Sequence, residues 1–252
     1  MSRLYVYAVI RAGDQRTVEL PPVCGTGSGV FCIPLGSIAV VVSATEEEEI
    51  LSTRRNMLSH TKILEELNRD HPILPFRFGL VAAGRDSLVA ILKKREAELA
   101  RALEDLVDVI EVGLKVSFVE AEIFREIVAE TPELRQRSAA LRQRPPAETY
   151  YERIELGRLV SQRVAARKQT LATTIAARFG GFARKAILHP TPDDMCVFDA
   201  AYLVARASEP ALFAELERFE KDMQGRLLIR YVAPTPPYNF VSMRLDALPM
   251  AA

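Results

Sequence analysis

The chain has 252 residues, of which 49% are hydrophobic and 26% are charged. That balance is typical of a folded globular protein and excludes a largely disordered chain. Lysine plus arginine and aspartate plus glutamate number 33 each, so the formal net charge is zero. Neither nucleic acid nor an anionic membrane is therefore expected as a partner. The three cysteines, an odd number without CxxC spacing, argue against a disulfide framework and a zinc site.

Hydrophobic patterns in the first part of the chain predict strands alternating with two helices. β-branched and aromatic residues predict strands at 4–10, 30–33 and 38–43, and an extended segment at 73–78. The glutamates after Thr45 predict a helix start, with the helix continuing to about Arg69. A leucine-rich stripe of helical period predicts one long helix over 86–105. Residues 1–108 are therefore predicted to form an N-terminal α/β domain.

Residues 109–252 are predicted to form a second domain with the order strand, helix, strand, strand, helix, strand. This order is the ferredoxin-like βαββαβ pattern, which makes the predicted fold class α+β. The first crossover is long and predicts a helical insertion, within which the basic run 135–144 is interpreted as a solvated loop. The expected helices and strands lie at 107–119, 150–178, 182–188, 195–204, 210–224 and 226–232.

No pattern of catalytic, cofactor-binding or metal-ligating residues is found. The glycines at 25–29 run into a strand-like segment and lack a following lysine, which favours a flexible loop over a phosphate cradle. His60 lies on the apolar face of its helix, where a hydrogen-bonded core histidine is the common case. Arg77, between Phe76 and Phe78, reaches solvent or a carboxylate at a sheet edge; the alternative is an ion pair that joins the two domains or contacts a partner. Gly157 inside a helix is best explained by close approach of another backbone.

Three separate segments resemble the gas vesicle protein F and protein L family. His60 followed by the run 74–79 (LPFRFG) is similar to the family's N-terminal signature, residues 150–158 (YYERIELGR) to its central helix, and residues 234–241 (PTPPYNFV) to its C-terminal signature. One departure is Ala233, where the family pattern leads us to expect glycine. The positions that carry the resemblance, with structural or partner-binding roles expected, are His60, Leu74, Pro75, Arg77, Phe78, Gly79, Tyr151, Glu155, Gly157, Arg158, Pro234, Pro236, Pro237, Tyr238 and Phe240.

The resemblance implies a non-enzymatic accessory protein of gas vesicle assembly. Its implied partners are the small hydrophobic shell protein (protein A type) and other gas vesicle accessory proteins, with no cofactor. Its implied location is the gas vesicle, where protein F is thought to lie at the gas-facing surface of the shell, and the cytoplasm. The apolar stretch after Met1 is too short for a signal sequence, and no run reaches the roughly 18 apolar residues needed to cross a bilayer.

Two other functions remain open from the residues themselves. A small-molecule enzyme or regulatory domain on a ferredoxin-like scaffold would need a pocket with converging titratable groups of shifted pKa. An RNA-binding module would need an exposed sheet face that is aromatic and basic, and the chain has no tryptophan and no excess of positive charge.

Overall fold

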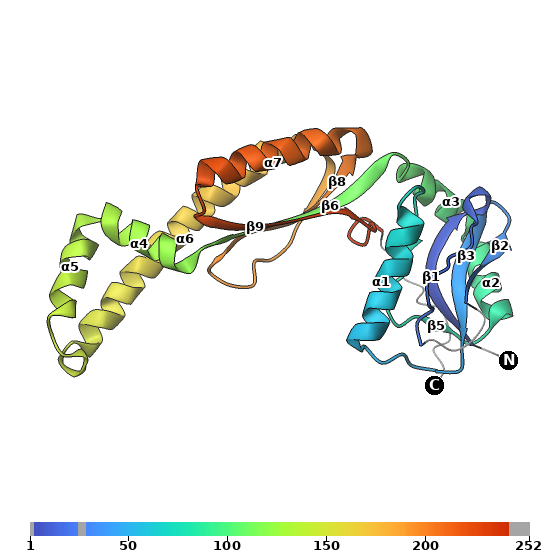
Figure 1. The fold of residues 1–252 in the computed structure, drawn as a ribbon, viewed down its shortest axis with the longest axis horizontal. Helices are drawn as coiled ribbons and strands as arrows, with labels where there is room; N and C mark the ends of the chain where they lie inside the picture. Colours follow the sequence, from blue (N-terminus) through green and yellow to red (C-terminus); the bar gives the residue numbers. More distant parts are fainter. Residues whose placement is uncertain (1–2, 25–28, 242–252) are drawn as a thin grey trace. The chain divides into compact units, whose positions relative to one another are not determined.

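The computed structural model describes residues 3–24 and 29–241. Within them it is an α+β structure with two antiparallel sheets, of five and four strands, and seven α-helices (Figure 1). Contacts divide the chain into two compact units, residues 112–232 and residues 1–111 together with those from 233 onward. The predicted division at residue 108 assigns the segment after 233 to the second domain, whereas the contacts group it with the first unit.

The first unit contains the five-stranded sheet and three helices. Strand β1 lies beside β3, and β3 beside β2, while β4 and β5 both pair with the other edge of β1. The elements in chain order are β1 (Arg3–Arg11), β2 (Val30–Leu35), β3 (Ile38–Thr45), α1 (Arg54–Asn68), β4 (Leu74–Pro75), β5 (Val81–Ala82), α2 (Arg85–Lys94) and α3 (Glu96–Asp105).

Both faces of this sheet are covered, which explains why its central strands read as continuous apolar runs. Every residue of β1 between Leu4 and Ile10 is buried. The apolar side of α1, with Ile63 and Leu64, packs into the core on one face, while α2 and α3 lie on the other side of the strands in Figure 1. A strand between two helical layers has neither face exposed to solvent, so polar residues are not required on alternate positions.

The second unit is built around the four-stranded sheet, in the order β7-β8-β6-β9. The C-terminal part of α6 packs on α7 through an edge-to-face contact of Phe179 with Phe219, whose ring centroids are 5.6 Å apart. Helices α4 and α5 pack on α6. The elements are β6 (Val109–Phe118), α4 (Glu120–Glu130), α5 (Pro132–Arg142), α6 (Tyr150–Gly180), β7 (Ala183–Leu188), β8 (Cys196–Ala205), α7 (Glu209–Met223) and β9 (Leu227–Thr235).

Two predicted helices of the first unit differ from those observed. Helix α1 begins at Arg54 and not after Thr45, because the Thr53 hydroxyl caps it by accepting a hydrogen bond of 3.2 Å from the Asn56 amide. The single helix expected over 86–105 is interrupted at Arg95. The interruption accompanies a contact in which the Glu96 carboxylate accepts two hydrogen bonds, of 2.8 and 2.9 Å, from the amide and hydroxyl of Ser37.

The basic run 135–144 is helical over most of its length, so its interpretation as a loop was wrong. Helix α5 begins at Pro132, a residue that suits the first turn of a helix. Its two buried residues, Leu134 and Leu141, are seven positions apart and therefore lie on one face. Burial of this narrow apolar stripe against α4 and α6 outweighs the strongly polar composition of the run. The predicted glycine loop falls mostly at 25–28, outside the described residues.

Candidate protein-interaction surface

The N-terminal signature surrounds a buried cluster of aromatic rings and His60. The Gly79 amide donates to the Tyr5 hydroxyl at 3.2 Å, and this hydroxyl lies 2.9 Å from Nδ1 of His60. Since Tyr5 accepts from Gly79, its own proton is available to Nδ1, which makes His60 a neutral acceptor. Rings of Tyr7 and Phe78 lie within 6 Å of the imidazole, with centroid distances of 5.9 and 5.7 Å. The cluster is a core element and holds no free nucleophile.

Burial sets the protonation of this cluster. Removal from water lowers the pKa of His60 from 6.5 to about 4, an effect that the Phe76 backbone partly offsets. Removal from water also raises the pKa of Tyr5 well above its ordinary value, although the hydrogen bond from Gly79 opposes the change. Both groups are therefore neutral near pH 7, and His60 acts as a structural hydrogen-bond acceptor.

The segment 74–79 is held against β1 by backbone hydrogen bonds. Leu74 and Pro75 form β4, and the Phe76 amide donates to the Tyr7 carbonyl at 2.8 Å. Gly79 has a φ of +92°, which an L side chain rarely adopts. Arg77 is exposed and makes no ion pair with any residue in the described ranges. An exposed side chain fits both a solvated arginine and one that contacts a partner, so the choice between these two interpretations stays a prediction.

The C-terminal signature also belongs to the first unit, where it includes the last two residues of β9 and the segment that follows. Its anchor is the buried carboxylate of Glu111, which accepts hydrogen bonds from the Asn239 backbone amide at 3.0 Å and from its side-chain amide at 2.6 Å. Pro236 and Pro237 are buried, whereas Pro234 is exposed and Phe240 half-buried. The Tyr238 phenol lies near enough to Tyr5 to contribute to the raised pKa of that residue. The first and third signatures therefore come together, about 160 residues apart in sequence.

The central signature is placed differently, on the exposed first turns of α6. Tyr151 is 83% exposed and Ile154 is 53% exposed. Glu155 and Arg158 form an ion pair of 2.7 Å. At 3.6 residues per turn, Tyr151, Ile154 and Arg158 lie on one side of the helix. Val164, which is buried, lies about a quarter of a turn from Ile154 around the helix.

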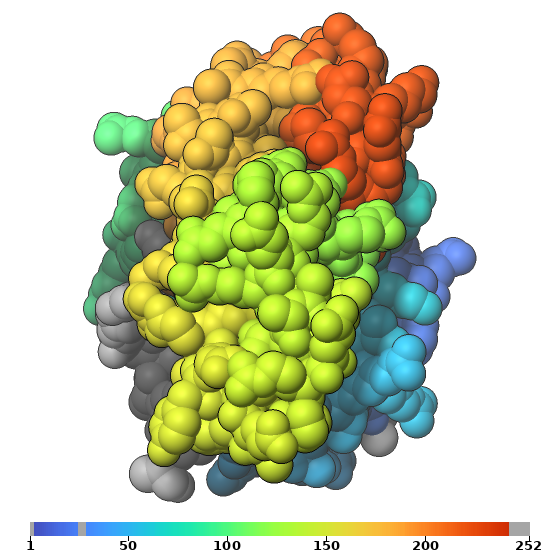
Figure 2. All heavy atoms as spheres, turned by 90° about the vertical axis from the view of Figure 1, so that its left-hand side faces the viewer, coloured from blue at the N-terminus to red at the C-terminus, as the bar shows by residue number. Residues whose placement is uncertain are grey.

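We define the α6 surface as Tyr150, Tyr151, Ile154 and Arg158. The two tyrosine rings contact each other edge to face, with centroids 5.4 Å apart. In Figure 2 the lime and yellow residues of α4, α5 and the start of α6 lie together toward the viewer. Tyrosine and arginine are the residue types that most often dominate protein–protein binding. Tyr150 and Ile154 were missed as site residues, although apolar residues three and four apart beside charged ones are the signal that identifies such a face.

Gly157 does not mark a close approach of another backbone, contrary to the expectation. A Cβ placed on Gly157 would meet no atom within 4 Å. The glycine therefore leaves the start of α6 without a side chain at an exposed position. Its cost to the helix, roughly 1 kcal/mol relative to alanine, is not offset by packing within the described chain.

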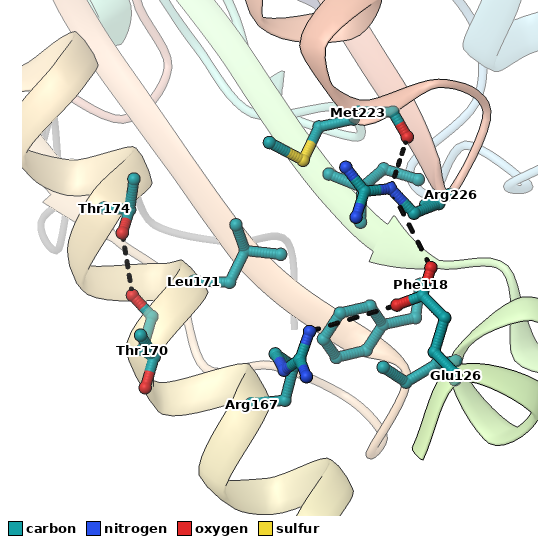
Figure 3. Close-up of a pocket in the computed structure, with 10 residues that line it drawn as sticks. Phe118, Glu126, Arg167, Thr170, Leu171, Thr174, Met223 and Arg226 are labelled. Atoms are coloured by element: carbon teal, nitrogen blue, oxygen red, sulfur yellow. Dashed lines mark hydrogen bonds and ion pairs between the residues drawn. The ribbon is translucent and has the colours of Figure 1, made fainter. Parts of the chain in front are cut away.

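One cavity lies between helices and strands of the second unit. Its volume is about 250 Å³, and Figure 3 shows its lining residues converging from α4, α6 and the end of α7. Thr170 and Thr174 on α6 donate their hydroxyls to backbone carbonyls four residues earlier. Neither hydroxyl is paired with a general base, so the cavity contains no activated nucleophile.

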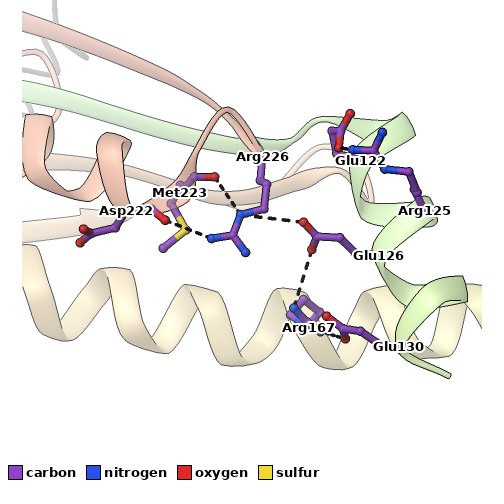
Figure 4. A network of polar contacts seen from close by, with 8 residues as sticks. All are labelled: Glu122, Arg125, Glu126, Glu130, Arg167, Asp222, Met223 and Arg226. Carbon is purple, nitrogen blue, oxygen red and sulfur yellow. Dashed lines mark hydrogen bonds and ion pairs between the residues drawn. The ribbon is translucent and has the colours of Figure 1, made fainter.

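The ionisable groups at this cavity neutralise one another. Glu126 lies between Arg167 and Arg226, at 3.9 and 3.8 Å, as Figure 4 shows. Arg167 also pairs with Glu130, and the Arg226 guanidinium donates to the Met223 carbonyl at 2.8 Å. This network ties α4 to α6 and to the turn after α7. These side chains therefore have a structural role within the second unit.

A cluster of metal ligands and a membrane-spanning helix are two other features that would bear on function. No group of three or more histidine, cysteine, aspartate or glutamate side chains is placed to hold a metal ion within 3–24 and 29–241. In the same ranges no helix has the length and apolar character needed to span a bilayer.

Comparison with known proteins agrees with the resemblance of the three signatures. Residues 3–242 match the family described as gas vesicle synthesis protein GvpL/GvpF. Gas vesicle protein F of Streptomyces sp. (strain CB03234) is 28% identical over 243 residues, covering 94% of this chain and 98% of the relative. Gas vesicle protein F of Nostoc sp. (strain PCC 7120) is 26% identical over 247 residues, covering 96% and 99%.

Two solved structures share the fold. The crystal structure of GvpF from Anabaena sp. PCC7120 superposes with a TM-score of 0.76 at 23% identity, covering 97% of this chain and 98% of that one. GvpF from Microcystis aeruginosa gives a TM-score of 0.74 at 24% identity, covering 96% and 99%. The family match extends over nearly the whole chain and is named for gas vesicle synthesis, not for catalysis. The chain belongs to the GvpL/GvpF family of gas vesicle proteins, which implies a role in gas vesicle formation.

Proposed function

We propose that this protein is a non-enzymatic accessory protein of gas vesicle formation that binds the hydrophobic shell protein through the α6 surface. The observation that carries the proposal is the exposure of Tyr150, Tyr151 and Ile154 beside Arg158. Large apolar side chains grouped on one helical face are typical of binding sites. An apolar helical surface suits a partner that must be kept from self-aggregation before it joins a growing shell. Other gas vesicle accessory proteins are the further partners expected, at the vesicle and in the cytoplasm.

We also infer that the second unit is a ferredoxin-like domain. Counted along the chain, β6, β7, β8 and β9 are its first to fourth strands, and the sheet order β7-β8-β6-β9 is second, third, first, fourth. This order, with helical crossovers after the first and third strands, supports that classification. Helices α4 and α5 lie in the first crossover and pack on α6, the helix that carries the surface.

The cavity of the second unit does not favour a small-molecule enzyme. Its volume of about 250 Å³ falls below the roughly 300–1,000 Å³ of typical ligand pockets. The carboxylate at its edge already has two guanidinium partners.

A co-purification experiment tests the α6 surface. The tagged full-length protein is co-expressed with the shell protein, and the amount of shell protein recovered is measured for wild type and for Tyr151→Ala/Ile154→Ser. Two central contact residues are expected to contribute enough that recovery falls about tenfold or more. The matched control is Leu228→Ser on β9, which removes another large, 64% exposed apolar side chain of the same unit and should leave recovery unchanged.

Two outcomes would contradict the proposal at different levels. Wild-type recovery by the Tyr151→Ala/Ile154→Ser variant would reject the α6 surface as the binding site. Gas vesicles of normal number and shape in cells that lack this protein would reject the role in assembly itself. Circular dichroism of each variant shows whether a loss of binding comes from unfolding.

A further inference from the structure

A groove runs along the outer side of α1 in the first unit. Its volume is about 540 Å³. Leu20, Pro21 and Leu58 provide apolar lining, and the cations of Arg54, Arg55 and Lys62 surround it. No carboxylate is among the lining residues, and none of the three cations forms an ion pair within the described ranges. We call this feature the α1 groove.

An acidic segment lies just before the groove in sequence. Glu46 to Glu49 are all exposed, and of these only Glu48 has a cationic partner in the described part of the chain, Arg3. The segment leads from the end of β3 toward α1 and contains no helix. Glu46, Glu47 and Glu49 are therefore carboxylates without a cationic partner in the described ranges.

Three exposed apolar side chains follow the acidic segment in sequence, and one of them, Leu58, lines the groove. Leu51 is 73% exposed, Met57 is 49% exposed and Leu58 is 47% exposed. Apart from Tyr238, these are all the large apolar residues of the first unit that are strongly exposed within the described ranges. All three lie within eight consecutive positions, at the start of α1 and just before it, and we call them the apolar patch.

We propose that this patch is the interface of a dimer in which a second copy of the chain inserts its acidic segment into the α1 groove. A two-fold symmetric interface requires one surface that complements itself. Here the carboxylates of residues 46–49 precede a stretch, 51–62, in which apolar and cationic side chains are interleaved, so a two-fold axis near Leu51 and Met57 would pair acids with cations twice. The apolar side chains are then buried at the centre. The proposal does not depend on the α6 surface or on a role in gas vesicles.

Charge and size give the expected behaviour of the dimer. Because the ion pairs surround a small apolar centre, association is expected to be weak and to decrease as salt screens the charges. Sedimentation equilibrium of the full-length wild-type protein from about 1 µM to about 1 mM, the range of weak association, measures this directly. A concentration-dependent dimer that weakens on raising salt is expected. A wild-type protein that stays monomeric over the whole range would overturn the proposal.

A charge-swap experiment tests the pairing itself. One variant, Arg54→Glu/Arg55→Glu, makes the groove acidic, and another, Glu47→Lys/Glu49→Lys, makes the segment basic. Each alone should dimerise at least about tenfold more weakly than wild type, because like charges then face each other. An equimolar mixture should recover dimerisation, since in the mixed dimer the two unchanged surfaces meet and the two reversed surfaces meet.

The remaining outcomes are also decisive. Arg85→Glu/Lys94→Glu, which reverses two exposed cations on α2 of the same unit, is the matched control and should dimerise as wild type does. Unchanged dimerisation of either charge-reversed variant, or no recovery in their mixture, would place any dimer interface elsewhere. Glutamates in the first turn of α1 are favourable to the helix dipole, so the groove variant is expected to fold, which circular dichroism verifies.

Discussion

The cluster around His60 in the first unit and the α6 surface both carry the family resemblance, but the cluster is largely buried and the α6 surface is exposed. In the first unit, His60 and Gly79 are joined through Tyr5 by hydrogen bonds, and His60 and Tyr5 are removed from solvent. On α6, Tyr151 and Ile154 make little contact with their own chain. A short sequence signature therefore identifies a family without revealing whether its residues stabilise the fold or contact a partner.

Substitution of His60 should have the largest effect on stability. His60→Ala removes a buried ring from among three aromatic rings and leaves the Tyr5 hydroxyl without its acceptor. A cavity plus an unsatisfied polar group is expected to lower the free energy of unfolding by about 3–4 kcal/mol, measured by urea denaturation. Arg77→Ala, at an exposed position in the neighbouring segment, is the control and should change it by less than about 0.5 kcal/mol. Equal effects of the two substitutions would contradict the division into buried and exposed roles.

Acid should destabilise the first unit through the same residue. Above pH 6.5 His60 is neutral in both states, so its ionisation does not affect stability. Between pH 6.5 and about 4 the unfolded chain binds a proton that the folded chain does not, because burial lowers the pKa of His60 to about 4. Stability is therefore lost as pH falls through this window, by on the order of 3 kcal/mol.

The pH effect is isolated by comparing two proteins. The difference in unfolding free energy between wild type and His60→Asn, measured from pH 7.5 to pH 4, removes the contribution of other titrating groups. The wild type should lose more stability over this window than the variant. A difference that does not change with pH would show that His60 titrates normally in the folded protein.

The smallest effect on stability is expected from substitution of Gly157, next to the exposed residues of α6. Gly157→Ala should raise the free energy of unfolding by about 0.5–1 kcal/mol, since the position is helical and the added Cβ meets no atom. Thermal or urea denaturation measures it. A Gly157→Ala protein that is less stable than wild type would indicate that another backbone does approach this position closely.

Much of the secondary structure follows from local patterns, and the exceptions have local causes that the patterns do not contain. Strands β1 and β3 lie where runs of β-branched and aromatic residues predict them, and helices α6 and α7 where helical period does. The start of α1 depends on Thr53, one of several residues able to cap a helix. Helix α5 depends on two leucines finding neighbours in α4 and α6. The start of α1 is set by one local hydrogen bond among several possible caps. Helix α5 is set by tertiary contacts that bury its two leucines.

The same limit applies to the candidate site. Signatures in the chain were sufficient to identify the family, but they listed His60, Tyr151 and Tyr238 together without distinguishing them. The contact of Glu111 with Asn239 spans 128 positions, and no local pattern specifies a pairing at that separation.

From residues alone, the chain determines its α+β class and its membership of the GvpL/GvpF family, because periodicity and short signatures are local properties. Tertiary structure alone decides that the C-terminal signature anchors on Glu111 in the first unit and that the start of α6 stays exposed. Burial depends on which distant surfaces meet, and this is settled by packing of the whole unit. That is why the same resemblance yields a buried structural cluster in one region and a surface available for binding in the other.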